Sequence, residues 1–398
     1  MTRTAPRQKE LEARWFQSLS AIDAEAWDSL ALPLKAPFLE WEWLHAMESS
    51  GSIAPETGWA PLHLTLWDGA RLAAAAPLYI KGHSEGEFVF DHMWWEVSEK
   101  IGVPYYPKLV GMSPVTPLAG YRFLVAPDQE EAAVTERLVG EINAVCRANR
   151  LSGCSFLHVD PGWQKQLEER GFSAWTHQSF QWVNEDFASF EDYLARFRTN
   201  QRRNIRRERR SLDRAGIRIT PLTGDEIPAS YFPLMYRYYA TTNEKFGPWG
   251  CKYLTRDFFE QIAVRYRHRL LVMAAFSENS GTEPLALSML LVKDRRLYGR
   301  YWGSAETVNH LHFNLCYYEP IRWAIENGIR TYDPGMGGFH KVRRGFRSVG
   351  NTSLHRFYHP HMQSILQTNI DRINQLERAN IDELNRAIPF TLREQGDG

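Results

Sequence analysis

The sequence is short of cysteine and carries no excess charge of either sign. Its 398 residues include four cysteines, Cys146, Cys154, Cys251 and Cys316. None of them stands in a CxxC pair, which argues against a disulfide framework and indicates reduced thiols in a cytoplasmic protein. Basic and acidic residues number 47 each, so no global field attracts nucleic acid or membranes. Any binding of an anion must therefore depend on a local cluster of charge.

Long apolar runs and the common cofactor motifs are also missing. The longest apolar runs, Leu72–Ile80 and Leu285–Val292, are too short to cross a bilayer. The basic N-terminus lacks the apolar segment of a signal peptide. No Walker, GxGxxG, HExxH or GxSxG pattern occurs, which argues against ATP cleavage, dinucleotide binding, a metal site and a serine-hydrolase elbow. We expect no metal and no tightly bound cofactor.

What the sequence does contain is many aromatic side chains and a repeated order of elements. Phe, Trp and Tyr make up 13% of the chain, which favours aromatic-lined binding sites. In each half an Arg-Gly-Phe tripeptide, Arg170–Phe172 or Arg344–Phe346, lies between a helix–strand unit and a strand rich in histidine and aromatics. This order predicts a duplicated α/β chain with segments 1–185, 186–360 and 361–398. The last segment holds an amphipathic helix, Leu366–Ala387.

Hydrophobic periodicity predicts the other main elements of both halves. The expected helices are Trp41–Glu48, Glu130–Asn149, Arg196–Arg218 and Val308–Glu326. The expected strands are Leu62–Trp67, Leu72–Ile80, Ser155–Val159, Ala174–Val183, Leu270–Phe276, Pro284–Val292, Leu297–Gly303, Ile329–Tyr332 and Thr352–Tyr358. A hairpin around Asp68-Gly69 should join the first two strands, and Lys293-Asp294 should form a turn.

The stretch from Pro77 to Lys108 places ionisable residues beside a dense aromatic cluster. It contains His83, Ser84, Glu87 and Asp91. If the backbone from Glu87 to Asp91 is extended, these two carboxylates lie on one face of it. Such residues are typical of a polar pocket, and equally of a satisfied hydrogen-bond network beneath a loop.

An arginine-rich stretch follows the predicted junction of the halves. Residues 196–218 contain ten arginines but only two acids, Glu208 and Asp213, and their apolar positions recur at near-helical spacing. A helix with broad basic faces suits a polyanion such as tRNA, a pyrophosphate or a phosphorylated headgroup. The alternative is a solvated helix whose arginines pair with acids from neighbouring elements.

Three further segments of the second half are candidates for chemistry. Tyr298–Ala305 leads from a strand through small residues to a helix, an arrangement that exposes backbone N–H groups to phosphate. The glycine-rich loop at 333–341 allows close approach of a ligand and ends in His340 and Lys341, a proton carrier and a cation. Cys316 lies in an apolar helix one turn after His312, which favours a core cysteine over a nucleophile.

Taken together, these segments resemble the FemAB-like peptidoglycan biosynthesis/recognition family of the GNAT acyltransferase superfamily. The resemblance rests on KGHSEGEFVFD (Lys81–Asp91), YYPKLV (Tyr105–Val110), PVTPLAGYR (Pro114–Arg122), RRNIRRERR (Arg202–Arg210), YLTRDFF (Tyr253–Phe259), GRYWG (Gly299–Gly303), CYYEPIRWAIENG (Cys316–Gly328) and HKVRRGF (His340–Phe346). The loop before His340 reads GMGGFHK where the family usually has GAQGEHK. Asn314 stands where the family usually has an acid.

The resemblance implies two tandem GNAT-like halves, each a mixed twisted sheet flanked by helices, and transfer of an acyl or aminoacyl group to an amine. The donor would be acyl-CoA or aminoacyl-tRNA, and tRNA is a candidate partner, whereas DNA is not. We expect the proton to be accepted by His83, Glu87 or Asp91. Substrate contacts are expected from Ser84, Tyr106, Lys108, Arg122, Trp302, His340 and Lys341. Donor contacts are expected from Arg202, Arg203, Arg206, Arg207, Arg300 and Gly303.

Two other functions fit the same residues. One is a non-catalytic protein that binds RNA or tRNA on a degenerate acyltransferase fold. The other is a module that binds peptidoglycan precursors without turnover.

Overall fold

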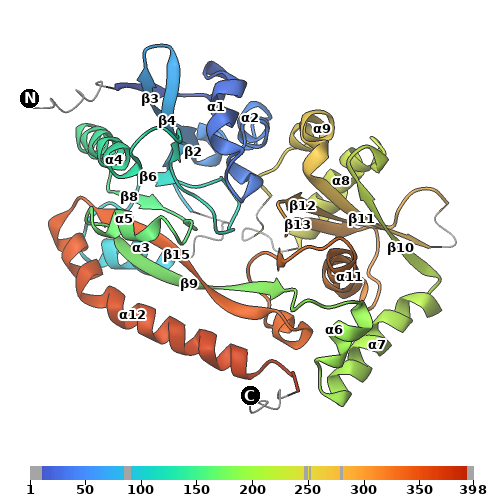
Figure 1. Cartoon of the computed structure of the whole chain (residues 1–398). Helices are drawn as coiled ribbons and strands as arrows, with labels where there is room; N and C mark the ends of the chain where they lie inside the picture. The colour runs from blue at the N-terminus through green and yellow to red at the C-terminus, as the bar shows by residue number, and fades with distance from the viewer. Residues whose placement is uncertain (1–10, 85–90, 246–249, 251, 278–280, 392–398) are drawn as a thin grey trace, which may run out of the picture. The chain divides into compact units, whose positions relative to one another are not determined.

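The computed structural model describes residues 11–84, 91–245, 250, 252–277 and 281–391, which form two compact units (Figure 1). The first unit comprises residues 11–84, 91–175 and 352–370, and the second comprises 176–351 and 371–391. Three elements begin in one unit and end in the other: β9 (Ser173–Val183), β15 (Arg347–Phe357) and α12 (Pro360–Arg386). The segments 1–185, 186–360 and 361–398 stay predictions, because compactness in space does not test a duplication in sequence.

The first unit contains strands of two sheets. Four strands pair antiparallel in the order β1 (Glu12–Phe16), β3 (His63–Asp68), β4 (Arg71–Ala76) and β7 (Leu124–Val125). The others pair in the order β15, β8 (Gly153–Phe156), β6 (Lys108–Gly111), β5 (Leu78–Lys81) and β2 (Trp59–Pro61). The β6–β8 pairing is parallel and the rest are antiparallel, so this part of the sheet is mixed.

The predicted hairpin around Asp68-Gly69 is confirmed, but its second strand is shorter than expected. Leu72–Ile80 was expected as one strand, whereas β4 ends at Ala76 and β5 begins at Leu78. Proline has no backbone N–H to donate to a ladder, so the intervening Pro77 interrupts the pairing. The chain then passes from the β3–β4 sheet to the strand that pairs with β6.

The helices of the first unit follow the apolar periodicity of the sequence. They are α1 (Ala24–Ala31), α2 (Trp41–Ser49), α3 (His92–Lys100), α4 (Glu131–Ala148) and α5 (Gln164–Glu168). Helix α4 starts where the Glu130 carboxylate accepts hydrogen bonds from the Ala132 and Ala133 backbone N–H groups. It buries Leu138 and Ile142, spaced one turn apart. The predicted helices at α2 and α4 are confirmed.

The sheet of the second unit is antiparallel except at one pair. Its strands follow the order β10 (Ile217–Thr223), β11 (Leu270–Ser277), β12 (Ala286–Lys293), β13 (Arg296–Ser304), β14 (Thr331–Asp333) and β9. β13 and β14 are parallel. The strands predicted at β9, β11, β12 and β13 are confirmed. The two residues of the β12–β13 turn, Asp294 and Arg295, have φ values of 47° and 60°, which suit a tight hairpin.

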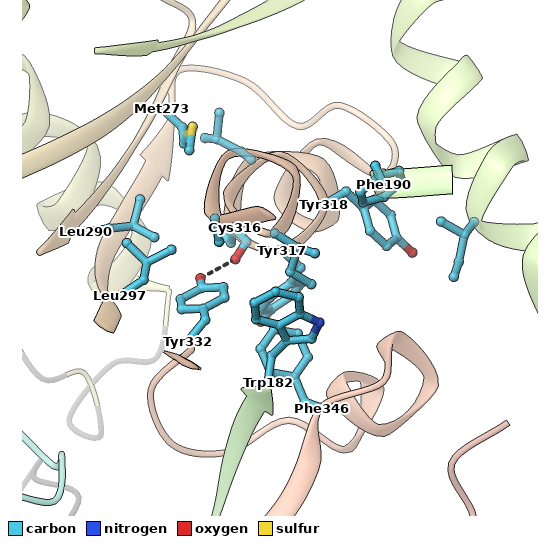
Figure 2. Close-up of a cluster of buried hydrophobic side chains, with 14 of the residues drawn as sticks. Trp182, Phe190, Met273, Leu290, Leu297, Cys316, Tyr317, Tyr318, Tyr332 and Phe346 are labelled. Carbon is cyan, nitrogen blue, oxygen red and sulfur yellow. Dashed lines mark hydrogen bonds between the residues drawn. The ribbon is translucent and has the colours of Figure 1, made fainter. Parts of the chain in front are cut away.

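The helices of the second unit surround a large aromatic core. They are α6 (Phe190–Ala195), α7 (Thr199–Arg214), α8 (Tyr231–Glu244), α9 (Arg256–Arg265), α10 (Leu311–Phe313), a π-helical segment (Asn314–Tyr318), α11 (Glu319–Glu326) and the 3-10 helix η8 (Phe339–Arg344). Figure 2 shows Trp182 and Phe346 beside Tyr317, and Tyr332 between this group and the sheet residues Leu290 and Leu297. The segment that carries Cys316 is therefore part of the core of this unit.

The predicted helix Val308–Glu326 differs from the observed one in its start and its winding. Helix begins at Leu311, and a π-helical turn interrupts it. A π turn breaks the regular i to i−4 bonding and is frequent at functional sites. The Tyr332 hydroxyl donates to the Cys316 carbonyl at 2.5 Å (Figure 2). The Asn314 amide donates to the carbonyls of His310 and Glu208. The contacts with Tyr332 and Glu208 come from distant parts of the chain, so local periodicity did not indicate the turn.

No helix in the described ranges combines the length and apolarity needed to span a bilayer.

Candidate functional site

The first unit holds a buried polar group that we name the Asp91–Lys108 cluster: Ser84, Asp91, Tyr105 and Lys108. Asp91 precedes α3 and Lys108 begins β6. The Lys108 ammonium donates to the Asp91 carboxylate, and the same oxygen accepts from the Tyr105 hydroxyl at 3.1 Å and the Ser84 hydroxyl at 3.4 Å. The ammonium also lies over the Tyr105 and Tyr106 rings, 4.3 and 5.1 Å from their centroids. The structure thus brings together four residues predicted from the sequence, Ser84, Asp91, Tyr106 and Lys108.

This cluster is shielded from solvent. The Asp91 and Lys108 side chains are 1% and 2% exposed. Burial alone would raise the pKa of Asp91, but the Lys108 charge and the hydrogen bonds from Lys108 and Tyr105 outweigh it and lower that pKa. A buried carboxylate with a lowered pKa is a weak proton acceptor. The catalytic role of Asp91 stays a prediction, and the geometry favours a structural ion pair.

The other sequence candidates of the first unit lie in different surroundings. The His83 ring packs against Gly58, where a Cβ atom would lie 2.5 Å from its Nε2 atom. Arg122 pairs with Glu131, the first residue of α4, at 2.5 Å. Glu87 lies outside the described residues, and so does the stretch expected to extend from it. Asp91 itself is not extended, because its backbone forms the N-cap of α3. The roles of His83, Glu87 and Arg122 stay predictions.

The second unit gathers a group that we name the Lys341 cluster: Trp302, His312, Tyr317, His340 and Lys341. The Lys341 ammonium donates to three successive backbone carbonyls, those of Gly335, Met336 and Gly337, at 2.8, 3.1 and 2.6 Å. An ammonium has three N–H donors, so all of them are used by the glycine-rich loop. Lys341 therefore fixes the shape of this loop, which the sequence indicated only as permissive.

Two histidines of the Lys341 cluster are held neutral. The Tyr317 hydroxyl lies 3.0 Å from His340 Nε2, and the Trp302 and His312 rings stack with centroids 4.4 Å apart. Burial first, and then the charges of Lys341 and Arg344, lower the pKa of His340 to about 4. Burial, together with His340, Lys341 and Arg344, lowers the pKa of His312 to about 3. Both imidazoles are uncharged at neutral pH, so the cations near this cluster are Lys341 and Arg344.

Asp333, for which no role was predicted, lies at the end of β14 beside this loop. Its carboxylate accepts a hydrogen bond from the Gly335 backbone N–H at 2.9 Å. Burial raises the pKa of Asp333 to about 6, although that hydrogen bond and the charges of Lys341 and Arg300 act in the opposite direction. The available signal was an acid at the carboxyl end of a short strand, directly before a glycine-rich loop.

Cys316 is a core residue. Its thiol is buried and lies 3.6 Å from the Ser288 hydroxyl. Burial raises the pKa of Cys316 to about 12, so the reactive thiolate is scarce at neutral pH. The structure therefore favours Cys316 as a packing residue of the core over Cys316 as a nucleophile activated by His312.

Gly303 and Arg300 do not lie in a turn before a helix, as Tyr298–Ala305 suggested. Both belong to β13, and Gly303 pairs with Leu287 of β12. A Cβ atom at position 303 would overlap the Tyr238 backbone of α8, which gives this glycine a packing role. The Arg300 guanidinium donates to the Tyr301 hydroxyl at 3.1 Å. Donor binding by these two residues stays a prediction.

The arginine-rich stretch forms a shorter helix than Arg196–Arg218, because the chain turns between α6 and α7 and enters β10 at Ile217. Arg206 pairs with Glu191 at 2.6 Å, and Arg209 pairs with Glu319 at 2.7 Å. On the inner side, Glu208 accepts from Arg344 at 2.7 Å. By contrast, within the described chain no acid pairs with three of the predicted donor contacts, Arg202, Arg203 and Arg207.

A pocket of about 520 Å³ lies beside the C-terminal half of α7. Both basic and acidic residues line it. The basic ones include Arg206, Arg210 and Arg218, and the acidic ones include Glu191 and Asp213. Its charges largely compensate each other. Arg202, Arg203 and Arg207 are not among its lining residues.

Comparison with known proteins agrees with the sequence resemblance. A model of the FemAB-like family, described as peptidoglycan biosynthesis/recognition, matches residues 18–392. A comparison of the sequence with curated proteins found no match.

Solved structures share the fold at low sequence identity. The structure of FemX is 12% identical and has a TM-score of 0.52, with 89% of this chain and 99% of that chain covered. The C-terminal DUF2156 domain of an Agrobacterium fabrum protein, described as a lysylphosphatidylglycerol synthetase, is 9% identical with a TM-score of 0.53, covering 88% of this chain and 96% of that one. The predicted α/β class, with mixed sheets flanked by helices, is confirmed. The division into two tandem GNAT-like halves stays a prediction.

Proposed function

The chain belongs to the FemAB-like family, and from this premise we propose that it is an N-acyl- or aminoacyltransferase with an amine acceptor. The donor carbonyl, a thioester of CoA or an ester of tRNA, is attacked by the amine nitrogen. A tetrahedral intermediate forms, and the thiol or hydroxyl leaves as the amide is made. This reaction needs cationic or N–H groups near the developing oxyanion and a base for the amine proton.

The observation that carries the proposal is the Lys341 cluster. Trp302 from β13, His312 and Tyr317 from the helical segment, and His340 and Lys341 from η8 come together although the sequence spreads them over about forty residues. The cluster combines an ammonium, two neutral imidazoles and aromatic surface. Lys341 supports an oxyanion by its charge and positions the loop at 335–337 through its three hydrogen bonds.

A transfer assay tests the proposal. We expect purified protein to form an amide when acyl-CoA or charged tRNA is supplied with a panel of amines that includes muropeptides, as detected by mass spectrometry. Replacing Lys341→Met frees the loop, and a displacement of about 1 Å in a reacting geometry costs about a hundredfold in turnover. The matched control Lys252→Met removes an exposed lysine whose acidic partner among the described residues is Glu244, and it should leave turnover unchanged. Folded wild-type protein that forms no amide with either donor class contradicts the proposal.

A second candidate function, RNA binding without catalysis, is favoured by one observation. Arg202, Arg203 and Arg207 project from α7 without an acidic partner among the residues described, so their charges are available to phosphate. If this face binds tRNA, each phosphate contact contributes about 0.7 to 0.9 to the slope of log affinity against log salt.

The triple variant Arg202→Gln, Arg203→Gln, Arg207→Gln should therefore bind tRNA more weakly, with a salt slope smaller by about 2 to 3. Fluorescence anisotropy at several salt concentrations measures this change. The control Arg206→Gln removes an arginine that Glu191 already neutralises, and it should have a smaller effect. An unchanged slope in the triple variant excludes this face as the phosphate contact. Binding of tRNA together with no amide formation would favour the non-catalytic function.

A further inference from the structure

The two parallel strands of the second unit separate at Asp333. β13 and β14 pair at three positions, the last of which joins Tyr298 to Asp333. β14 ends there, whereas β13 continues to Ser304. In open α/β sheets, ligands bind outside the carboxyl ends of strands where neighbouring strands part. Asp333 thus lies at the carboxyl end of β14, where the pairing with β13 stops.

The backbone beside Asp333 approaches β13 closely. A Cβ atom at Gly299 would lie 3.0 Å from the Tyr332 hydroxyl and 3.4 Å from the Pro334 Cα atom. After Pro334, Gly335, Gly337 and Gly338 all have positive φ values, of 80°, 72° and 84°. Glycine adopts such values without strain, so the loop can fold back over the strand end. The Asp333 carboxylate therefore lies beside a glycine-rich loop that approaches it closely, as the 2.9 Å hydrogen bond from the Gly335 backbone N–H shows.

Asp333 is not neutralised by the cations around it. Four titratable groups influence this carboxylate or are influenced by it: Tyr298 and Arg300 on β13, Tyr332 on β14 and Lys341 on η8. Across the described ranges, none of the basic groups comes within 4.0 Å of it to form an ion pair. Lys341 explains this, because all three of its N–H donors are bound by backbone carbonyls. The residue as a whole is half-buried, and burial of its carboxylate is the main cause of its raised pKa.

Among the candidate bases, Asp333 has the basicity that the reaction needs. A general base works best when its pKa lies near the operating pH. The pKa of Asp333 is raised to about 6, the pKa of His340 is lowered to about 4, and the pKa of Asp91 is lowered. Asp91 is also enclosed by its contacts with Lys108 and Tyr105. Of these three residues, Asp333 has the pKa nearest to neutral pH, and unlike Asp91 it is not held in an ion pair with a described residue.

We propose that Asp333 is the general base of the transferase, which accepts the proton of the acceptor amine as its nitrogen bonds to the donor carbonyl carbon. This inference rests on the proposed function. The new N–C bond forms while the C–S or C–O bond of the donor breaks. The proton passes from the nitrogen to the Asp333 carboxylate and from there to the departing sulfur or oxygen, so no oxidant or further reactant is required.

Asp333→Asn tests the assignment. The amide keeps the size of the side chain and an oxygen to accept the Gly335 N–H, but it cannot take a proton at neutral pH. We expect kcat to fall about a hundred- to ten-thousand-fold while the KM for the donor stays within about threefold. In the wild-type protein kcat should rise as the pH passes through about 6, because the base must lose its proton to act. This acid limb should be absent from the variant.

Two further variants separate the possible outcomes. Asp382→Asn changes an exposed acid of α12 and should preserve both kcat and the acid limb. Asp333→Ala should regain activity when formate is added as an external base, which a purely structural loss does not permit. If Asp333→Asn is folded and retains the wild-type kcat and acid limb, or if formate fails to restore Asp333→Ala, Asp333 is not the base although the transferase function stands. If the wild-type protein transfers to no amine, the proposed function fails, and this role fails with it.

Discussion

Replacing Lys108→Met is expected to lower the free energy of unfolding by about 3 to 5 kcal/mol, because it leaves the buried Asp91 carboxylate without its counter-charge. Asp91 is 1% exposed, so water cannot take the place of the ammonium. The hydroxyls of Ser84 and Tyr105 continue to donate to the carboxylate, but they carry no charge. Chemical denaturation of the variant and the wild-type protein measures the difference.

Two comparisons give this result its meaning. Lys165→Met removes one partner of an exposed pair, in which the Lys165 side chain is 86% exposed and lies 3.9 Å from Glu169, and it should change stability by less than about 1 kcal/mol. The double variant Asp91→Asn, Lys108→Met removes both charges together and should recover much of the loss. A stable Lys108→Met variant with impaired turnover would instead support the predicted role of Lys108 in substrate binding.

The wild-type ion pair also gives stability a defined dependence on pH. The pKa of Asp91 is depressed in the folded protein below its ordinary value of 3.8. The corresponding stability is therefore complete above that value and is lost as the pH falls through the depressed pKa. Acid titration of the Lys108→Met variant should lack this component.

Gly303→Ala is expected to destabilise the second unit by about 3 kcal/mol or more. The added Cβ atom would overlap the carbonyl group of Tyr238, which belongs to the backbone of α8 and cannot rotate away. Overpacking of this kind typically costs about 1 to 3 kcal/mol when side chains can adjust, and a backbone neighbour adjusts less. Thermal or chemical unfolding measures the effect.

Gly140→Ala provides a control of opposite sign. Gly140 is exposed within α4, and nothing lies within 4 Å of a Cβ atom built there. Alanine is favoured over glycine inside a helix by about 0.5 to 1 kcal/mol, so this variant should be slightly more stable. If Gly303→Ala unfolds like the wild-type protein but loses donor affinity, the glycine serves the donor, as the sequence suggested, and not the packing of α8.

The sequence was informative where a local pattern determines the structure. The apolar runs that became β11, β12 and β13 are bounded by turn residues such as Asp294, and α4 shows both a helical repeat and a capping glutamate. These features depend on neighbours a few residues away. The family motifs then placed such elements in the correct fold class.

The remaining features depend on contacts between residues far apart in the sequence. Lys108 was predicted to contact the substrate because its ion-pair partner could not be identified from the sequence. The structure shows that Asp91 caps α3 and pairs with Lys108. Asp333 was not predicted because the sequence does not show that the Lys341 ammonium donates all three of its hydrogen bonds to backbone carbonyls and forms no ion pair with Asp333. Glu208, counted as an isolated acid in a basic run, proved to hold Arg344 on the inner side of α7.

The discontinuity of the first unit has a consequence for synthesis. Residues 352–370 belong to this unit, and Leu354 to Phe357 provide the neighbour of β8. The ribosome releases these residues only after the whole continuous part of the second unit has been made. The half that is synthesised first must therefore wait, with the edge of β8 open, until nearly all of the chain has emerged. Domains that fold in order from the N-terminus avoid such a delay, and an unpaired strand edge favours aggregation in the meantime. Expression of residues 1–185 alone would make that waiting state permanent.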